Sequence, residues 1–135
     1  MLIQNGYNIF VSAEDVNYLV KLANKFKEQG NYSIAISLYD KALRIDNNFI
    51  NALDGKGWAL IELGNYTQAL PYFDKALQID PNLVDALNFK GQALYNLGNY
   101  TESKYYLDKA LQINPKDLLL NKFLQNLASN KTSAL

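Results

Sequence analysis

Hydrophobic residues recur along this chain at steps of three and four positions, which is the spacing of one face of an α-helix. Between positions 50 and 63, two adjacent rows of small or apolar residues follow this spacing: Ala52, Leu53, Gly57, Ala59, Leu60 and Leu63. After a short polar break, a second set follows it again: Ala69, Phe73, Ala76 and Leu77. The pattern predicts one helix over 50–63, which Gly64 ends in a left-handed conformation. It predicts another helix over 68–79, with Thr67 as its N-cap.

The chain repeats itself every 34 residues, so the same pair of helices is predicted three times. Leu-Gly-Asn-Tyr-Thr at 63–67 recurs at 97–101, and a looser copy, Gln-Gly-Asn-Tyr-Ser, stands at 29–33. Residues 50–83 and 84–117 are identical at 19 of 34 positions, which unrelated helices would not reach by chance. The sequence therefore predicts six units: an apolar N-terminal arm over 1–15, repeats over 16–49, 50–83 and 84–117, a capping helix over 118–129, and a tail over 130–135.

Small residues stand in the middle of the predicted first helices. Gly57 and Gly91 occupy equivalent positions, and a mid-helix glycine costs up to about 1 kcal/mol relative to alanine. Close approach of the second helix explains such glycines. The matching contact is expected at three equivalent alanines of the second helices: Ala42, Ala76 and Ala110.

Both ends of the repeat array carry distinct segments. After the third repeat, Asp117 is expected to cap a terminal helix with one apolar face and one polar face, which an open stack needs for solubility. At the other end, Ser12 to Asp15 have the pattern of a capping box that opens the first helix. The arm before it is too apolar for a solvated tail. Three alternatives are open for this arm: it folds back on the first repeat, it docks on a second chain, or it is disordered.

Composition narrows the possible chemistry. The 135 residues include neither cysteine nor histidine, which excludes disulfides, thiolate nucleophiles, Cys/His zinc sites and imidazole bases. Carboxylate and lysine chemistry stay open, but we expect neither catalysis nor a metal or other cofactor. Thirteen basic and thirteen acidic side chains cancel, so we expect neither nucleic acid nor membrane as a partner. Without an apolar stretch of about 20 residues or a secretory signal, the expected location is cytoplasmic.

The repeat resembles the tetratricopeptide repeat (TPR), a helix-turn-helix unit of this length. The resemblance is carried in the second repeat by Leu53, Gly57, Leu60, Ala69, Phe73, Ala76 and Pro81, and in the third by Leu87, Gly91, Leu94, Ser103, Leu107, Ala110 and Pro115. In the first repeat it is carried by Leu19, Ala23, Phe26, Ala35, Tyr39, Ala42 and Asn47. Lys56 and Lys90 replace a usual apolar residue, as in archaeal and bacterial members. The resemblance implies an all-α fold, a right-handed α-solenoid of three TPR units with a capping helix.

The resemblance also implies a concave groove that binds a peptide segment of a partner protein. Carried over position by position, its lining includes Asn17, Asn24, Asn51, Asp54, Trp58, Asn88, Gln92 and Tyr95. Amide side chains both donate and accept hydrogen bonds, so they can pair with a peptide backbone. Trp58 is the only tryptophan, and three roles are open for it. It anchors a bound peptide, it covers the groove floor, or it packs on the N-terminal arm.

One TPR subtype, the carboxylate clamp that holds the acidic tails of heat-shock chaperones, requires cations that this chain lacks. The resemblance places five residues at the clamp positions: Val20, Asn24, Gly55, Asp85 and Phe89. Only Asn24 has the matching side chain, and a terminal carboxylate would meet Asp85 instead. We therefore predict no clamp of this type.

The sequence favours two functions over a third, a regulatory or enzyme-associated part of a larger assembly. The first is a protein-protein interaction adaptor that binds a peptide segment in the concave groove. The alternative is a self-assembling scaffold, in which residues 1–11 dock on a neighbouring chain and form a homodimer.

Overall fold

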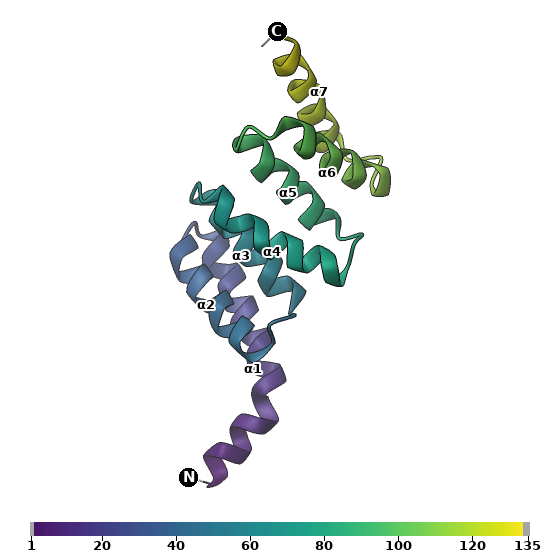
Figure 1. The fold of residues 1–135 in the computed structure, drawn as a ribbon. Helices are drawn as coiled ribbons and strands as arrows, with labels where there is room; N and C mark the ends of the chain where they lie inside the picture. Colours follow the sequence, from purple (N-terminus) through teal and green to yellow (C-terminus); the bar gives the residue numbers. More distant parts are fainter. Residues whose placement is uncertain (1, 134–135) are drawn as a thin grey trace.

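The computed structural model describes the backbone of residues 2–133 and the side chains of residues 15–117 and 120–129. Seven α-helices and no β-strand lie within residues 2–133 (Figure 1): α1 (Leu2–Glu28), α2 (Tyr32–Ile45), α3 (Ile50–Glu62), α4 (Tyr66–Ile79), α5 (Val84–Asn96), α6 (Tyr100–Ile113) and α7 (Leu118–Ser133). The expected all-α fold class is confirmed.

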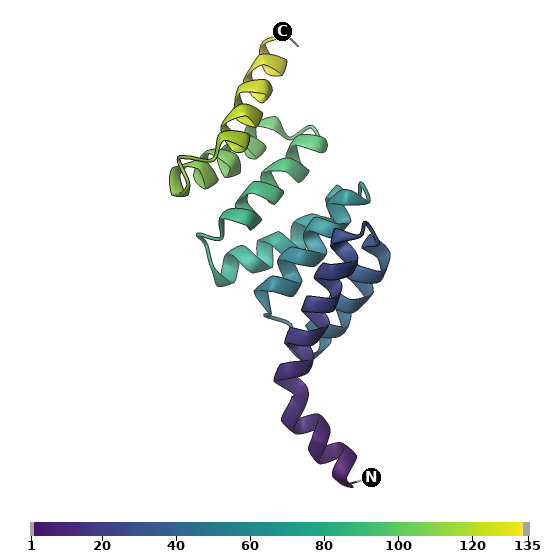
Figure 2. The same cartoon turned by 180° about the vertical axis from the view of Figure 1, so that it is seen from behind.

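The helices pack in sequence order along one stack. α1 packs on α2, α3 on α4, and α5 on α6, and the second helix of each of the first two pairs also packs on the first helix of the next pair. α7 packs on α6 at one end, and the first turns of α1 project from the other end (Figures 1 and 2). The predicted helix pairs are therefore successive units of a solenoid.

Each pair turns through the same short connection. The glycines that end the first helices all have a positive φ: Gly30 at 79°, Gly64 at 79° and Gly98 at 84°. The Gly64 N–H donates to the Ile61 carbonyl at 2.8 Å, and the Asn65 N–H donates to the Leu60 carbonyl at 2.8 Å. The same two bonds form in the other two turns. This Schellman arrangement satisfies carbonyls at the helix end and confirms Gly64 as the terminating residue.

The second helices begin earlier than predicted. α4 starts at Tyr66 with Asn65 at the N-cap, so the assignment of Thr67 to this position is wrong. The reason is that the Asn65 carbonyl already accepts a hydrogen bond from the Ala69 N–H at 3.1 Å. The glycine turn closes within two residues, which places the repeated tyrosine inside the first helical turn.

Glycines in the middle of the first helices accommodate large side chains of the second helices. A Cβ atom on Gly57 would lie 2.6 Å from the Phe73 ring, and one on Gly91 would lie 2.6 Å from the Leu107 side chain. The side chains nearest to these glycines are therefore not the expected Ala76 and Ala110. The buried residue one turn earlier fills the space, because the missing Cβ leaves room for a whole side chain.

Buried side chains form three clusters that follow one another along the stack. Leu43 packs against the first and second clusters, and Leu77 packs against the second and third. Ser103 is the one buried polar side chain among those that the structure describes, and its hydroxyl donates to the Gly91 carbonyl at 2.6 Å. The core therefore runs through all three pairs.

The N-terminal helix is longer than predicted. α1 is continuous from Leu2 to Glu28, so Ser12 lies inside the helix and the predicted capping box is wrong. A fold-back of the arm is also wrong, because the arm is part of a helix that projects from the stack (Figure 1). The segment contains no proline, and extending an existing helix costs far less than starting one.

The C-terminal helix begins as predicted and ends later. The Asp117 carboxylate accepts a hydrogen bond from the Leu120 N–H at 3.0 Å, which confirms it as the cap. Leu120 and Leu127 are buried, whereas Gln125 and Asn126 are exposed, so α7 covers the array with a polar outer side. The helix continues to Ser133, beyond the expected end near residue 129. Predictions for residues 1 and 134–135 lie outside the described part of the chain.

Replacing Gly91 by leucine is expected to lower the free energy of unfolding by roughly 1–3 kcal/mol, because the new side chain overlaps Leu107. Thermal and denaturant unfolding of G91L measure this effect. Gln112→Leu, at an exposed position of α6, is the control and should change stability little. Unchanged stability of G91L would contradict the observed helix pairing.

Candidate functional site

The first helices of the pairs lie closer together than the second helices. α1 contacts α3 and α3 contacts α5, whereas α2, α4 and α6 make no comparable contacts with one another within residues 2–133. The stack therefore curves toward its first helices. We call the surface formed by α1, α3 and α5 the inner face, and the surface formed by α2, α4 and α6 the outer face.

All eight predicted site residues lie on the helices of the inner face. Asn17 and Asn51 are exposed, and six are half-buried: Asn24, Asp54, Trp58, Asn88, Gln92 and Tyr95. Their side-chain contacts fall into two groups. The first group joins α1, α2 and α3 around Trp58 and Asp54, and the second lies on α5 and extends toward α7.

Trp58 is the centre of the first group. Its ring packs edge-on against Tyr32, with centroids 5.7 Å apart, and against Phe89, with centroids 6.5 Å apart. The Lys27 ammonium lies over the same ring, 5.0 Å from the centroid. Trp58 thus links α1, α2, α3 and α5, and its half-buried ring still presents part of its surface on the inner face.

The environment of Asp54 disfavours the charged form of its carboxyl group. Its Oδ1 atom is buried and has no hydrogen-bond donor among the described residues. Burial and the negative charge of Asp85 raise the pKa of Asp54 from 3.8 to about 6, and the positive charge of Lys27 acts in the opposite direction. The carboxylate therefore lies close to charges from both neighbouring first helices, one of each sign.

Asn24 is already engaged within the protein. Its Oδ1 accepts a hydrogen bond from the Tyr39 hydroxyl, which reaches the inner face from α2. Gly55 makes this possible, because a Cβ atom there would lie 2.5 Å from the Tyr39 ring. Burial, followed by the charges of Asp54 and Glu28, raises the pKa of Tyr39 to about 12, so the hydroxyl keeps its proton.

Sequence reasoning missed Tyr39 and Gly55 as members of the site. Gly55 gave a signal, since it is a further mid-helix glycine in the second repeat. Tyr32 also belongs to the site, because its ring contacts Trp58 and its hydroxyl donates to Glu62 at 3.5 Å. Side chains of second helices that pass between first helices cannot be found from the periodicity of the first helices.

The second group is built by α5. The Gln92 Nε2 donates to the Asn88 Oδ1 at 3.0 Å, one helical turn apart. Tyr95 packs against Tyr100 of α6 at 5.3 Å and against Phe123 of α7 at 5.1 Å between ring centroids. The amides predicted to pair with a peptide thus also pair with each other, and Tyr95 helps to hold α7.

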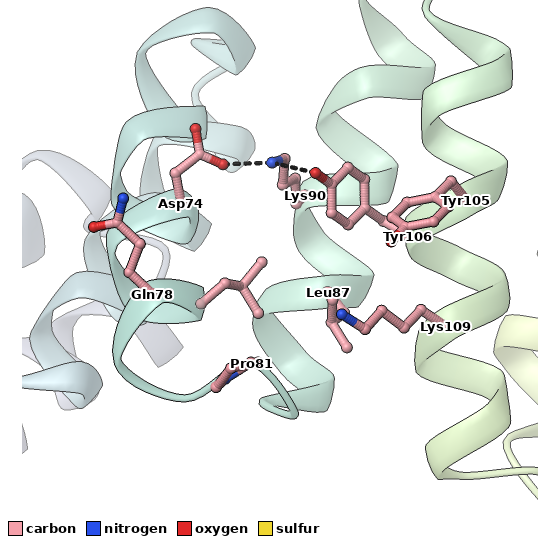
Figure 3. Close-up of a pocket in the computed structure, with 9 residues that line it drawn as sticks. Asp74, Gln78, Pro81, Leu87, Lys90, Tyr105, Tyr106 and Lys109 are labelled. Carbon is pink, nitrogen blue, oxygen red and sulfur yellow. Dashed lines mark hydrogen bonds and ion pairs between the residues drawn. The ribbon is translucent and has the colours of Figure 1, made fainter.

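The outer face has two hollows at equivalent positions of successive repeats. One of about 410 Å³ lies between α4 and α6 (Figure 3), and one of about 420 Å³ lies between α2 and α4. Every lining position of the first recurs 34 residues earlier in the second. In Figure 3, Lys90 joins Asp74 to Tyr106, whose hydroxyl accepts its hydrogen bond at 2.8 Å.

Lys56 and Lys90, the departures from the usual apolar pattern, hold the two junctions between repeats. Lys56 pairs with Asp40 and lies 4.3 Å from the Tyr72 ring centroid. Burial alone would lower the pKa of both lysines, but their hydrogen bonds to aspartate and tyrosine outweigh it and raise the pKa. In each hollow the first-helix lysine already pairs with the aspartate of the preceding second helix, so we assign this ion pair to repeat stacking.

Comparison with known families agrees with this architecture. Two tetratricopeptide repeat models match, one at residues 20–83 and one at residues 60–127. The second match spans half of the chain, and the protein belongs to the tetratricopeptide repeat family. The right-handed α-solenoid of three units with a terminal helix is the fold of this family.

Solved structures of TPR domains superimpose closely. The first TPR of Spaghetti (RPAP3) bound to the HSP90 peptide SRMEEVD has a TM-score of 0.85 at 20% identity, over 88% of this chain and 94% of that chain. The Arabidopsis OM64 TPR domain has a TM-score of 0.83 at 22% identity, over 86% and 96%. The Aspergillus fumigatus Sgt2 TPR domain has a TM-score of 0.82 at 21% identity, over 88% and 80%. No curated protein matches the sequence.

The described residues include neither a membrane-spanning helix nor a cluster of metal-binding side chains. No helix among them combines the length and apolar character needed to cross a membrane. Likewise, the described acidic side chains do not gather in a group of three that could hold a metal ion.

Asp54→Asn is expected to stabilise the protein at neutral pH. Because the folded-state pKa is raised, Asp54 imposes no penalty below its unfolded pKa near 4. The penalty grows between about pH 4 and pH 6 and is fully present above that range. At pH 7.5 the substitution should raise the free energy of unfolding by about 1–3 kcal/mol. Below pH 4 the difference should vanish.

Denaturant unfolding at the two pH values measures this prediction. Asp108→Asn is the matched control, since the Asp108 carboxylate pairs with Lys104 on the surface. A D54N protein less stable than wild type at pH 7.5 would show that Asp54 is not strained.

Proposed function

We propose that this protein is a non-catalytic adaptor that binds a peptide segment of a partner protein on its inner face. Family membership supports a role in protein interaction. Two structures with the same fold have peptide ligands: the first TPR of Spaghetti holds an HSP90 peptide, and the second TPR of human RPAP3 holds an HSP70 peptide. At 20% identity these two structures establish the fold alone. The ligand of this protein therefore has to be inferred from its own residues.

The observation that carries the proposal is the position of Trp58. A large aromatic ring is half-buried on the inner face, where rings from two neighbouring helices and the Lys27 ammonium hold its orientation. A fixed aromatic ring with part of its surface open is a typical anchor for a binding partner. The amides Asn17 and Asn51, both exposed on the same face, add polar contacts for a peptide backbone.

The ligand proposed here differs from an acidic chaperone tail. At the clamp positions the inner face has Asp85 and Phe89 on α5, and Gly55 on α3, where the Tyr39 ring fills the adjacent space. None of these groups can pair with a terminal carboxylate. We therefore retain the prediction that the protein has no carboxylate clamp.

Trp58→Ala is expected to weaken binding of the native partner by roughly 2 kcal/mol or more. A partner captured from the native host by the wild-type protein, and then purified, provides the ligand for isothermal titration. Circular dichroism of W58A verifies that the helices remain. Unchanged affinity would remove Trp58 from the site.

Tyr105→Ala is the control for this experiment. Tyr105 is an aromatic side chain on the outer face and is 60% exposed. Its loss should leave affinity for the partner unchanged. Equal loss of binding in both variants would place the partner on the outer face or on both faces.

A second candidate function, self-assembly, is favoured by the projection of α1. The helix has 27 residues, about 40 Å in length, and its first turns extend beyond the stack (Figure 2). Ile9 and Leu2 lie seven and fourteen residues before the core residue Val16, and therefore occupy the same helical register. An apolar register that continues past the array suits contact with a second copy.

Light scattering tests self-assembly on the full chain and on a shortened chain that begins at Ser12. We expect a dimer for the full chain and a monomer for the shortened one, since the projecting turns are missing. Ile9→Glu in the full chain should act like the truncation. If the full chain is a monomer at high concentration, the self-assembly proposal fails while the adaptor proposal stands.

A further inference from the structure

The inner face is acidic, although the chain as a whole is neutral. Six carboxylates belong to its three helices, and four of them occupy the repeat positions of the inner face: Glu28, Asp54, Glu62 and Asp85. Of the five lysines on these helices, Lys56 and Lys90 line the outer hollows. Lys27 lies against Trp58, and Lys21 is exposed at the repeat position that Phe89 occupies in α5. The balance is negative, and two of the carboxylates, Asp54 and Asp85, lie close enough to affect each other.

Lys27 shows how this surface holds a cation. Its ammonium lies over the Trp58 ring, 5.0 Å from the centroid, and its charge partly compensates the repulsion and burial that act on Asp54. One side-chain cation, however, faces two carboxylates. Asp85 is exposed, and the buried Oδ1 of Asp54 has no donor among the described residues. Around Trp58, the two carboxylates of Asp54 and Asp85 therefore outnumber the one ammonium group of Lys27.

We propose, on the basis of the adaptor function, that the inner face selects a basic peptide segment, with a lysine or arginine side chain placed beside Trp58 and opposite Asp54 and Asp85. The apolar stem of such a side chain can lie along an aromatic ring while its charged head stays in the polar part of the site. The indole face attracts the cation. The carboxylates supply the opposite charge, and they repel an acidic segment.

Trp58 is the only tryptophan, so its fluorescence reports on this site in the intact protein. The probes are capped peptides Gly-Ala-Xaa-Leu-Xaa-Ala-Gly, in which Xaa is arginine, lysine, glutamine or glutamate. The peptide SRMEEVD with a free carboxyl terminus is a fifth probe. We expect the arginine and lysine peptides to bind more tightly than the glutamine peptide, and the two acidic peptides to bind least. Added salt should weaken the basic peptides most.

Three variants have expected effects of different sign. Asp85→Asn should weaken binding of the arginine peptide by about twofold to fivefold, which is usual for loss of one exposed charge contact. Lys27→Met keeps the apolar stem and removes the competing cation, so it should strengthen binding. Asp108→Asn removes one carboxylate from the opposite surface and should have no effect.

The outcomes separate this inference from the adaptor function on which it rests. Tighter binding of SRMEEVD or of the glutamine peptide than of the basic peptides overturns the charge preference and leaves the adaptor proposal in place. Equal effects of D85N and D108N also overturn it, since the gain would then come from net charge alone. If no peptide binds, the inference is overturned, and the adaptor proposal is decided by the effect of W58A on the captured partner.

Discussion

The structure depends on steric fit between a first-helix position without a bulky side chain and a large side chain of the second helix. Phe73 occupies the space above Gly57, and Leu107 occupies that above Gly91. A methyl group at either glycine would meet these buried side chains well inside contact distance, so the two helices can approach only as they do. Because this contact recurs with the repeat, it gives successive pairs nearly the same geometry, and the curvature of the stack follows.

The junctions between pairs use a different kind of interaction. Lys56 and Lys90 each reach back to an aspartate on the preceding second helix and forward to a tyrosine of their own pair. Where the array ends, the pattern changes: the equivalent position in α7 is Leu124, and Asp108 pairs with Lys104 of its own helix. A charge at this position therefore marks an internal junction, and an apolar residue marks the terminal helix.

The inner face was partly predictable. The eight candidate residues lie on three adjacent helices, as their shared repeat positions indicated, and their role as a peptide groove stays a prediction from the TPR resemblance. What those side chains contact was not predictable. Asn24 accepts a bond from Tyr39, a residue of α2, and Trp58 is held by Lys27, Tyr32 and Phe89 from three other helices. These contacts join segments remote in sequence, and the periodicity of one helix carries no information about them.

By itself, the sequence determined the helix pairs, the 34-residue period, the glycine turns and the polar cap, because each depends on residues close together along the chain. It misjudged the start of α4 and the extent of α1, where backbone hydrogen bonds and helix propagation overrode the expected caps. Tertiary structure alone decided the unfavourable environment of Asp54. Its burial and its nearness to Asp85 and Lys27 arise when three helices pack side by side, and an electrostatic environment depends on distances through space.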